Sequence, residues 1–204
     1  MIVKKLIVGQ LKANCYLVFH NNNKKATIID PGDDADYIQR IIFDLELKPI
    51  KIIATHGHFD HILAVNELKH AFNIPFLMHK KDEFLLSQMR SSCKFFTGFD
   101  PGPAPKIDKY LTGHGLISKI EIIETPGHTP GGISLYIEKD KVLLCGDLIF
   151  KEGVVGRTDF VYSRKKDLEK SVEKIFKLQQ DTLVYPGHGE EFLISDFKQN
   201  NTKI

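Results

Sequence analysis

The chain has 204 residues and carries 28 Lys and Arg against 26 Asp and Glu, which leaves a formal net charge of +2 at pH 7. Such a small net charge argues against nucleic acid or an acidic membrane surface as a partner. With 42% hydrophobic and 26% charged residues, the composition is that of a globular domain and excludes a disordered chain. The three cysteines are far apart in sequence and form no Cys-x-x-Cys pair, so they indicate neither a disulfide framework nor a cysteine-type zinc site.

The N-terminal third predicts three strands followed by a helix. The strands cover about residues 2–8, 15–20 and 26–30, and apolar residues at helical spacing predict a helix over about 34–45. The first six residues contain two lysines and no long apolar core, so we expect no signal peptide and a cytoplasmic protein. No stretch of the sequence approaches the length of a transmembrane helix.

A predicted strand over residues 50–54 leads directly into the most informative part of the chain. The stretch from Thr55 to His61 holds three histidines and one aspartate. Imidazole is the commonest metal ligand near neutral pH, and Asp adds a hard oxygen donor. Crowding four such groups together is costly unless a positive ion orders them. The stretch therefore predicts a metal site rather than a solvated loop, and a helix is expected from about Asp60 to Phe72.

The middle of the chain predicts a strand, a helix and a long irregular segment. The strand covers residues 75–78 and the helix lies near 80–89, while glycines and prolines recur through 91–115. A long loop inside a compact domain is often functional, and here it suggests a flap over the site. His114 lies in this loop and is a minor candidate for a place at the mouth of the site.

Three later strands each end just before one candidate ligand. They cover about residues 120–125 before His128, 141–146 before Asp147 and 182–185 before His188. Glycine and proline surround these ligands, which allows sharp turns and close backbone approach. Ligands of α/β sheets generally lie beyond the carboxyl ends of the strands, so these side chains are expected to gather at one edge. A strand near 132–138 and a helix over about 165–178 complete the C-terminal half.

These motifs, taken in order, resemble the metallo-β-lactamase-fold superfamily over nearly the whole chain. The motifs are Thr-His-x-His-x-Asp-His from Thr55, Pro-Gly-His-Thr-Pro-Gly around His128, Gly-Asp at Asp147 and Pro-Gly-His at His188. The resemblance implies an α/β (α+β) fold, a four-layer αββα sandwich formed as a single domain over residues 1–204. Within the superfamily the chain is most similar to short bacterial glyoxalase II-like proteins, on the strength of residues 156–160 and 186–189.

The resemblance also implies two divalent metal ions and assigns their ligands. Zinc is the expected ion, with iron and manganese as alternatives, because all three accept His and Asp ligands. Asp147 is expected to bridge the two ions. The remaining ligands divide into His56, His58 and His128 for one ion and Asp60, His61 and His188 for the other.

Two adjacent cations support hydrolysis without a Ser, Cys or Lys nucleophile. A water shared by the ions has a lowered pKa, so that hydroxide exists near pH 7. Asp60 and Asp147 are the expected catalytic residues, since their carboxylates reduce the positive charge and can orient the nucleophile. The resemblance implies a small-molecule thioester substrate such as S-lactoylglutathione, with Arg157 as the residue that contacts the glutathione carboxylate.

Three points qualify this interpretation. Arg157 is as well placed to pair with Asp159, or with the loop of Asp147, as to bind substrate. No tyrosine follows Arg157 at the expected place, and the chain ends soon after His188, so we expect no C-terminal glutathione-binding helical domain. These departures suggest poor affinity for glutathione conjugates or a different thiol as acyl carrier.

Two alternative functions remain open from the sequence. A persulfide dioxygenase on the same fold would use a single iron held by His56, His128 and Asp147. A non-catalytic, metal-stabilised binding module would need an incomplete or closed site, whereas all seven expected ligands are present here.

Overall fold

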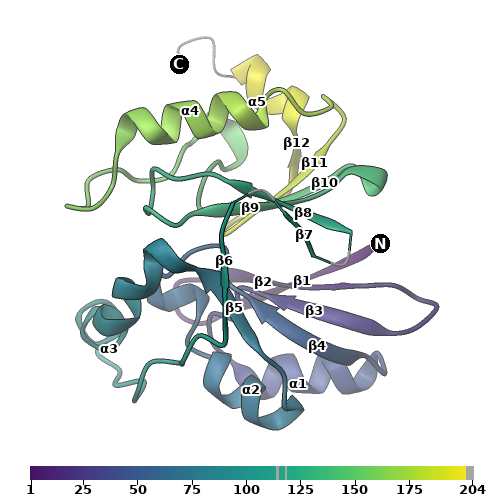
Figure 1. The fold of residues 1–204 in the computed structure, drawn as a ribbon, viewed down its shortest axis with the longest axis vertical. Helices are drawn as coiled ribbons and strands as arrows, with labels where there is room; N and C mark the ends of the chain where they lie inside the picture. Colours follow the sequence, from purple (N-terminus) through teal and green to yellow (C-terminus); the bar gives the residue numbers. More distant parts are fainter. Residues whose placement is uncertain (114, 118, 201–204) are drawn as a thin grey trace. The chain divides into compact units, whose positions relative to one another are not determined.

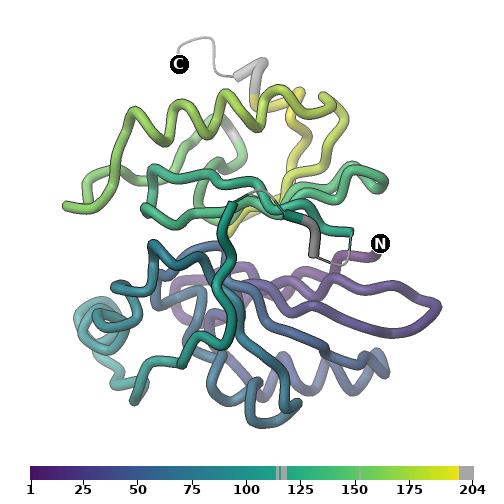
Figure 2. The backbone as a smooth tube through the Cα atoms, viewed as in Figure 1, coloured from purple at the N-terminus to yellow at the C-terminus, as the bar shows by residue number. Residues whose placement is uncertain are grey.

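The computed structural model describes residues 1–113, 115–117 and 119–200, so His114 lies outside the described residues. The chain divides into two compact units, Met1–Leu111 and Thr112–Ile204. Each unit holds one six-stranded sheet with helices of its own (Figure 1). The backbone trace in Figure 2 follows the chain through the first sheet before it enters the second.

The sheet of the first unit has the strand order β1-β2-β3-β4-β5-β6. Its strands are β1 (Ile2–Val8), β2 (Ala13–Phe19), β3 (Lys25–Ile29), β4 (Lys48–Ile53), β5 (Phe76–His79) and β6 (Lys109–Leu111). The first three strands pair antiparallel, and β3 to β6 pair parallel. Because β3, β4 and β5 run in the same direction, the loops that follow them emerge at one edge of the sheet.

Three helices belong to the first unit: α1 (Ala35–Asp44), α2 (Val65–Phe72) and α3 (Glu83–Thr97). The apolar stripes of α1 and α2 are buried in one core with residues of the sheet. Ile38, Ile42 and Leu68 from the helices and Ile28 and Ile52 from the strands are all fully buried there. The helix predicted over 34–45 is therefore confirmed, and its spacing of apolar residues is what buries it.

The predicted boundaries were wrong around two of these helices. The helix expected from Asp60 begins as a 3₁₀ turn, Phe59–His61, and α2 itself begins only at Val65. The segment 91–115 was expected to be irregular, yet α3 continues through its first residues to Thr97. Burial of Met89 and Cys93 stabilises this extension, and Gly98 ends the helix in the left-handed conformation at φ 73°.

The sheet of the second unit has the order β12-β11-β10-β9-β8-β7. Its strands are β7 (Gly115–Ile117), β8 (Ile120–Glu124), β9 (Ile133–Ile137), β10 (Val142–Gly146), β11 (Leu183–Pro186) and β12 (Phe192–Leu193). Strand β9 pairs antiparallel with both β8 and β10, while β11 pairs parallel with β10. Strands β8, β10 and β11 therefore share one direction and deliver the residues after them to one edge, as predicted.

Helices α4 (Lys165–Ile175) and α5 (Ile194–Asn200) belong to the second unit. Leu168, Val172 and Ile175 of α4 are buried in one core with Leu143 and Val184 of the sheet. The same core contains Cys145, which is a buried free thiol. Strand β12 and α5 were not predicted. Within the described residues, no helix combines the length and apolarity needed to cross a membrane.

Candidate metal centre

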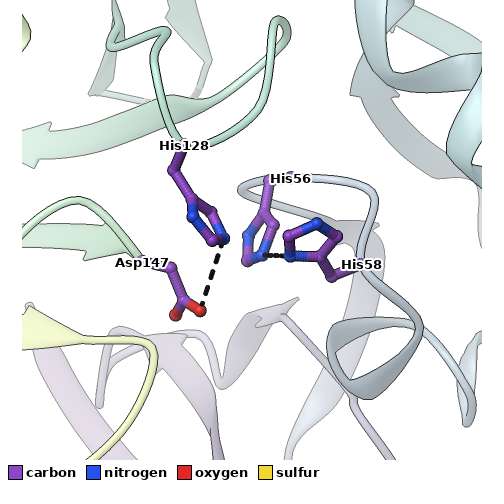
Figure 3. Close-up of side chains that lie close together, drawn as sticks. All are labelled: His56, His58, His128 and Asp147. Atoms are coloured by element: carbon purple, nitrogen blue, oxygen red, sulfur yellow. Dashed lines mark hydrogen bonds and ion pairs between the residues drawn. The ribbon is translucent and has the colours of Figure 1, made fainter. Parts of the chain in front are cut away.

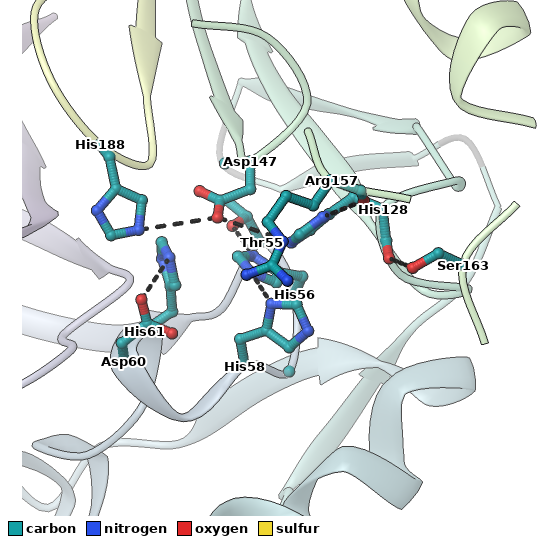
Figure 4. Close-up of polar contacts among 12 residues, drawn as sticks. Thr55, His56, His58, Asp60, His61, His128, Asp147, Arg157, Ser163 and His188 are labelled. Atoms are coloured by element: carbon teal, nitrogen blue, oxygen red, sulfur yellow. Dashed lines mark hydrogen bonds and ion pairs between the residues drawn. The ribbon is translucent and has the colours of Figure 1, made fainter. Parts of the chain in front are cut away.

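Four potential ligands follow β4 in the first unit: His56, His58, Asp60 and His61, here called the loop donor set. The Nε2 atom of His56 lies 3.1 Å from Nδ1 of His58 (Figure 3). The Nε2 atom of His61 lies 3.8 Å from Oδ2 of Asp60 (Figure 4). The rings of His56 and His61 also contact each other, with their centroids 4.3 Å apart. The structure therefore brings all four predicted residues of this stretch into contact with one another.

Asp30, which follows β3, contacts His61 directly and His56 through Thr55. Its Oδ2 lies 3.2 Å from Nδ1 of His61 and accepts a hydrogen bond of 2.6 Å from the Thr55 hydroxyl. The Thr55 hydroxyl oxygen in turn lies 3.1 Å from Nδ1 of His56. Because Asp30 is buried and also accepts from the Thr55 amide at 2.7 Å, its position is fixed. One carboxylate thus orients His61 directly and His56 through Thr55.

Two glycines allow the loop to pack this closely. A Cβ on Gly32 would lie 1.9 Å from the carbonyl oxygen of Asp60, so only glycine fits against the loop at that point. The Gly57 amide donates a hydrogen bond of 3.0 Å to the buried carboxylate of Asp82. Gly57, between the first two histidines, is therefore held against Asp82.

The second unit contributes His128, Asp147 and His188, here called the strand-end donor set. They follow β8, β10 and β11, the three strands that share one direction. Oδ2 of Asp147 lies 3.7 Å from Nε2 of His128 (Figure 3). The same oxygen lies 3.7 Å from Nε2 of His188 (Figure 4). Asp147 therefore lies between two imidazoles.

The segment from Gly156 to Ser163 packs directly on the strand-end donor set. A Cβ on Gly156 would lie 2.0 Å from the carbonyl oxygen of Asp147, so glycine is required there. The carbonyl of Arg157 lies 2.9 Å from Nδ1 of His128, and the Ser163 hydroxyl donates to the His128 carbonyl at 2.7 Å. Since a carbonyl can only accept, Nδ1 of His128 donates this hydrogen bond, and Nε2 faces Asp147.

The side chain of Arg157 makes a bidentate ion pair with Asp159. Its Nε and Nη2 atoms lie 3.0 and 2.7 Å from the two carboxylate oxygens of Asp159. Arg157 is labelled in Figure 4. The guanidinium also lies 4.8 Å from the centroid of the Phe160 ring. Of the two roles that the sequence left open for Arg157, the structure thus contains the pair with Asp159.

The chemistry of both donor sets fits divalent metal ions. Two ligands of a tetrahedral ion with bonds of about 2.1 Å lie roughly 3.4 Å apart. The donor pairs within the two sets are separated by 3.1 to 3.8 Å. His61 and His128 each have the second ring nitrogen against a carboxylate or carbonyl oxygen, as metal-ligating histidines almost always do. Nitrogen and carboxylate ligands suit zinc, iron and manganese alike.

Sequence reasoning located the ligands better than the groups that support them. Asp30 supports the ligands through its contacts with Thr55 and His61. The role of Thr55 between Asp30 and His56 was missed, as was the hydrogen bond from Ser163 to His128. A threonine directly before the first histidine was the available signal for the former. No local pattern pointed to Ser163, because it reaches His128 across 35 positions of sequence.

The chain forms two six-stranded mixed sheets, and His and Asp donors follow their strands. This arrangement is typical of a metal-binding α/β fold. Residues 8–188 match the family model of the metallo-β-lactamase superfamily. The chain belongs to this superfamily, and the predicted fold class is confirmed.

Relatives and solved structures extend the comparison to almost the full chain. The chain is 33% identical to the hydroxyacylglutathione hydrolase GloC of Haemophilus influenzae, with 98% of this chain and 97% of that protein covered. The crystal structure of the BLEG-1 B3 metallo-β-lactamase matches with a TM-score of 0.91 and 32% identity, covering 98% of both chains. The structure of TTHA1623 in a di-iron-bound form also has a TM-score of 0.91, at 29% identity, and covers 98% of this chain and 99% of that one.

Proposed function

We propose that this protein is a binuclear metal-dependent hydrolase that cleaves acyl thioesters, built as a single metallo-β-lactamase-like domain over residues 1–204. In this proposal the loop donor set and the strand-end donor set act on the same two ions. His56, His58 and His128 would hold one ion, Asp60, His61 and His188 would hold the other, and Asp147 would be shared by both. Zinc is the proposed ion, with iron and manganese as alternatives, and the di-iron form of TTHA1623 supports a pair of metals in a related chain.

The observation that carries the proposal is the presence of a complete second group of donors. A single-iron dioxygenase would need only His56, His128 and Asp147. Nε2 of His61 nevertheless lies 3.8 Å from Oδ2 of Asp60, and Asp30 fixes the orientation of the His61 ring. Such support for residues that a single ion would not use favours the hydrolase over the dioxygenase.

The metal ions and the surrounding side chains have separate roles in the proposed hydrolysis. Divalent ions, when bound, supply Lewis acidity and lower the pKa of a water molecule. The carboxylates of Asp60 and Asp147 would offset the positive charge of bound ions, and an Oδ atom of Asp60 would accept a hydrogen bond from the attacking water and so orient it. Thr55 and Asp30 keep His56 and His61 in place, so little reorganisation is needed when the substrate arrives.

Two observations favour thioesters as substrates. One is the activity named for the relative GloC, and the other is the presence of Arg157 near the strand-end donor set. GloC, which is 33% identical, is named a hydroxyacylglutathione hydrolase. A thiolate leaving group is soft and suits a borderline-soft ion such as zinc. Arg157 is the proposed contact for a carboxylate of the thiol carrier, since its guanidinium has the fork geometry that carboxylates accept.

Hydrolysis of S-lactoylglutathione by the metal-reconstituted protein tests the proposal. We expect turnover in the wild type and in the surface control Asp36→Ala, but a loss of at least about 100-fold in Asp60→Ala, because a residue that orients the nucleophile contributes on this scale. Oxygen consumption with glutathione persulfide is measured in parallel. Absence of thioester hydrolysis in the metal-loaded protein, together with oxygen uptake by a preparation that holds one iron per chain, would establish the dioxygenase instead.

A further inference from the structure

The guanidinium of Arg157 is already occupied by a carboxylate of the same chain. Asp159 engages it through two hydrogen bonds of 3.0 and 2.7 Å, which is the bidentate arrangement that a substrate carboxylate would also use. Both side chains are largely exposed, at 61% for Arg157 and 63% for Asp159. An incoming anion can therefore reach the pair, but Nε and Nη2 of the guanidinium already donate to Asp159.

Arg157 is also restrained on a second side, so it cannot easily offer another face. Its guanidinium lies 4.8 Å from the Phe160 centroid, and Phe160 stacks on Tyr162 with centroids 5.3 Å apart and an interplanar angle of 8°. The Phe160 ring in turn meets the edge of His128, a proposed metal ligand, at 5.9 Å. The backbone of Arg157 is bound to the same histidine. The ion pair therefore has a fixed place beside the strand-end donor set.

We propose that Asp159 is a specificity-determining residue that competes with the substrate carboxylate for Arg157 and so disfavours thiol carriers that are anionic at this point. This inference rests on the proposed function and refines the role of Arg157 in it: Arg157 contacts a carrier carboxylate only after Asp159 has moved away, so carriers without a carboxylate at this point are favoured. Glutathione thioesters are accepted only after Asp159 has been displaced, whereas a neutral carrier of the same size meets no such requirement.

The expected size of the effect follows from the strength of the competing pair. A ligand that binds only the open form has its apparent Kd raised by the reciprocal of the open fraction. Exposed ion pairs are weak, and bidentate geometry places this one at the upper end, so release of Arg157 should strengthen carboxylate binding about threefold to tenfold. The hydrogen bond from Arg157 lowers the pKa of Asp159, so the competing carboxylate is ionised throughout the neutral pH range.

Binding of an unreactive thioether separates this inference from catalysis. Calorimetry is performed on the metal-loaded protein with S-methylglutathione and with its diethyl ester, which has the same chain without carboxylates. Asp159→Asn is expected to lower the Kd of S-methylglutathione about threefold to tenfold and to leave the Kd of the diester unchanged. The gain should vanish in the double variant Arg157→Gln/Asp159→Asn, since the released guanidinium is its source.

Asp181 provides the matched control. It is 62% exposed and pairs with Lys141 in the same unit, so Asp181→Asn makes the same change of charge away from the candidate site. Equal gains in Asp159→Asn and Asp181→Asn, equal gains for both ligands, or no gain at all would each overturn the inference. Because thioethers are not hydrolysed, these results do not depend on turnover, and failure of the proposed function would show separately in the S-lactoylglutathione assay.

Discussion

Asp147→Asn is expected to lower kcat/KM for thioester hydrolysis by at least about 1,000-fold, the equivalent of roughly 4 kcal/mol of transition-state stabilisation. The carboxylate lies 3.7 Å from Nε2 of both His128 and His188 and is proposed to bridge the two ions. Asparagine has nearly the same shape but no charge, so the substitution removes the bridge without opening a cavity. Metal content and kcat/KM are measured on the same preparation.

The control for this prediction is the variant Asp181→Asn, which removes a carboxylate of the second unit that lies in a surface ion pair. It should retain both metals and wild-type activity. If Asp147→Asn keeps two ions per chain and loses less than about tenfold in kcat/KM, less than roughly 1.4 kcal/mol, Asp147 is not a bridging ligand.

Asp30→Asn is expected to weaken metal binding by about 10- to 100-fold, the range typical of partners that orient ligating histidines. The carboxylate is not one of the proposed metal ligands, but it faces Nδ1 of His61 and accepts from the Thr55 hydroxyl that supports His56. An amide retains one acceptor oxygen and replaces the other by a donor, so one of these contacts is lost. Competition with a chelator gives the affinity, and thermal unfolding of the metal-free protein gives the stability.

Asp34→Asn is a matched control for this variant. Asp30 and Asp34 both have left-handed backbones, with φ 50° and 52°, and asparagine tolerates that conformation. The carboxylate of Asp34 likewise accepts a hydrogen bond from a backbone amide, that of Gly9 at 2.8 Å, but contacts none of the proposed ligands. Loss of stability in Asp30→Asn with unchanged metal affinity would show that Asp30 supports the fold alone.

The sequence was most informative where a strand ends in a ligand. Apolar runs bounded by glycine and proline predicted β4, β8, β10 and β11, and the shared direction of the last three brings His128, Asp147 and His188 to one edge. These predictions succeeded because burial of the strands and the need for tight turns after them both act locally. The ordered motifs then indicated the superfamily, which the family model confirmed.

The remaining features depend on contacts between residues far apart in sequence. The end of α3 was misplaced because burial of Met89 and Cys93 extends a helix that the loop-like composition after it did not suggest. Strand β12 and α5 were missed although Phe192 and Phe197 are buried in the second unit. Sequence could not decide whether Arg157 pairs with Asp159 or binds a substrate carboxylate. The two roles differ only in the orientation of the Arg157 side chain.

The number of metal ions bound per chain tests the binuclear assignment most directly. The purified protein is stripped, reconstituted with zinc, freed of loosely bound ions and analysed by mass spectrometry. We predict two ions per chain in the wild type and one in His188→Ala, in which the second ion keeps only Asp60, His61 and the carboxylate of Asp147 that it shares with the first ion. One ion per chain in the wild type, unchanged in His188→Ala, would contradict the binuclear hydrolase.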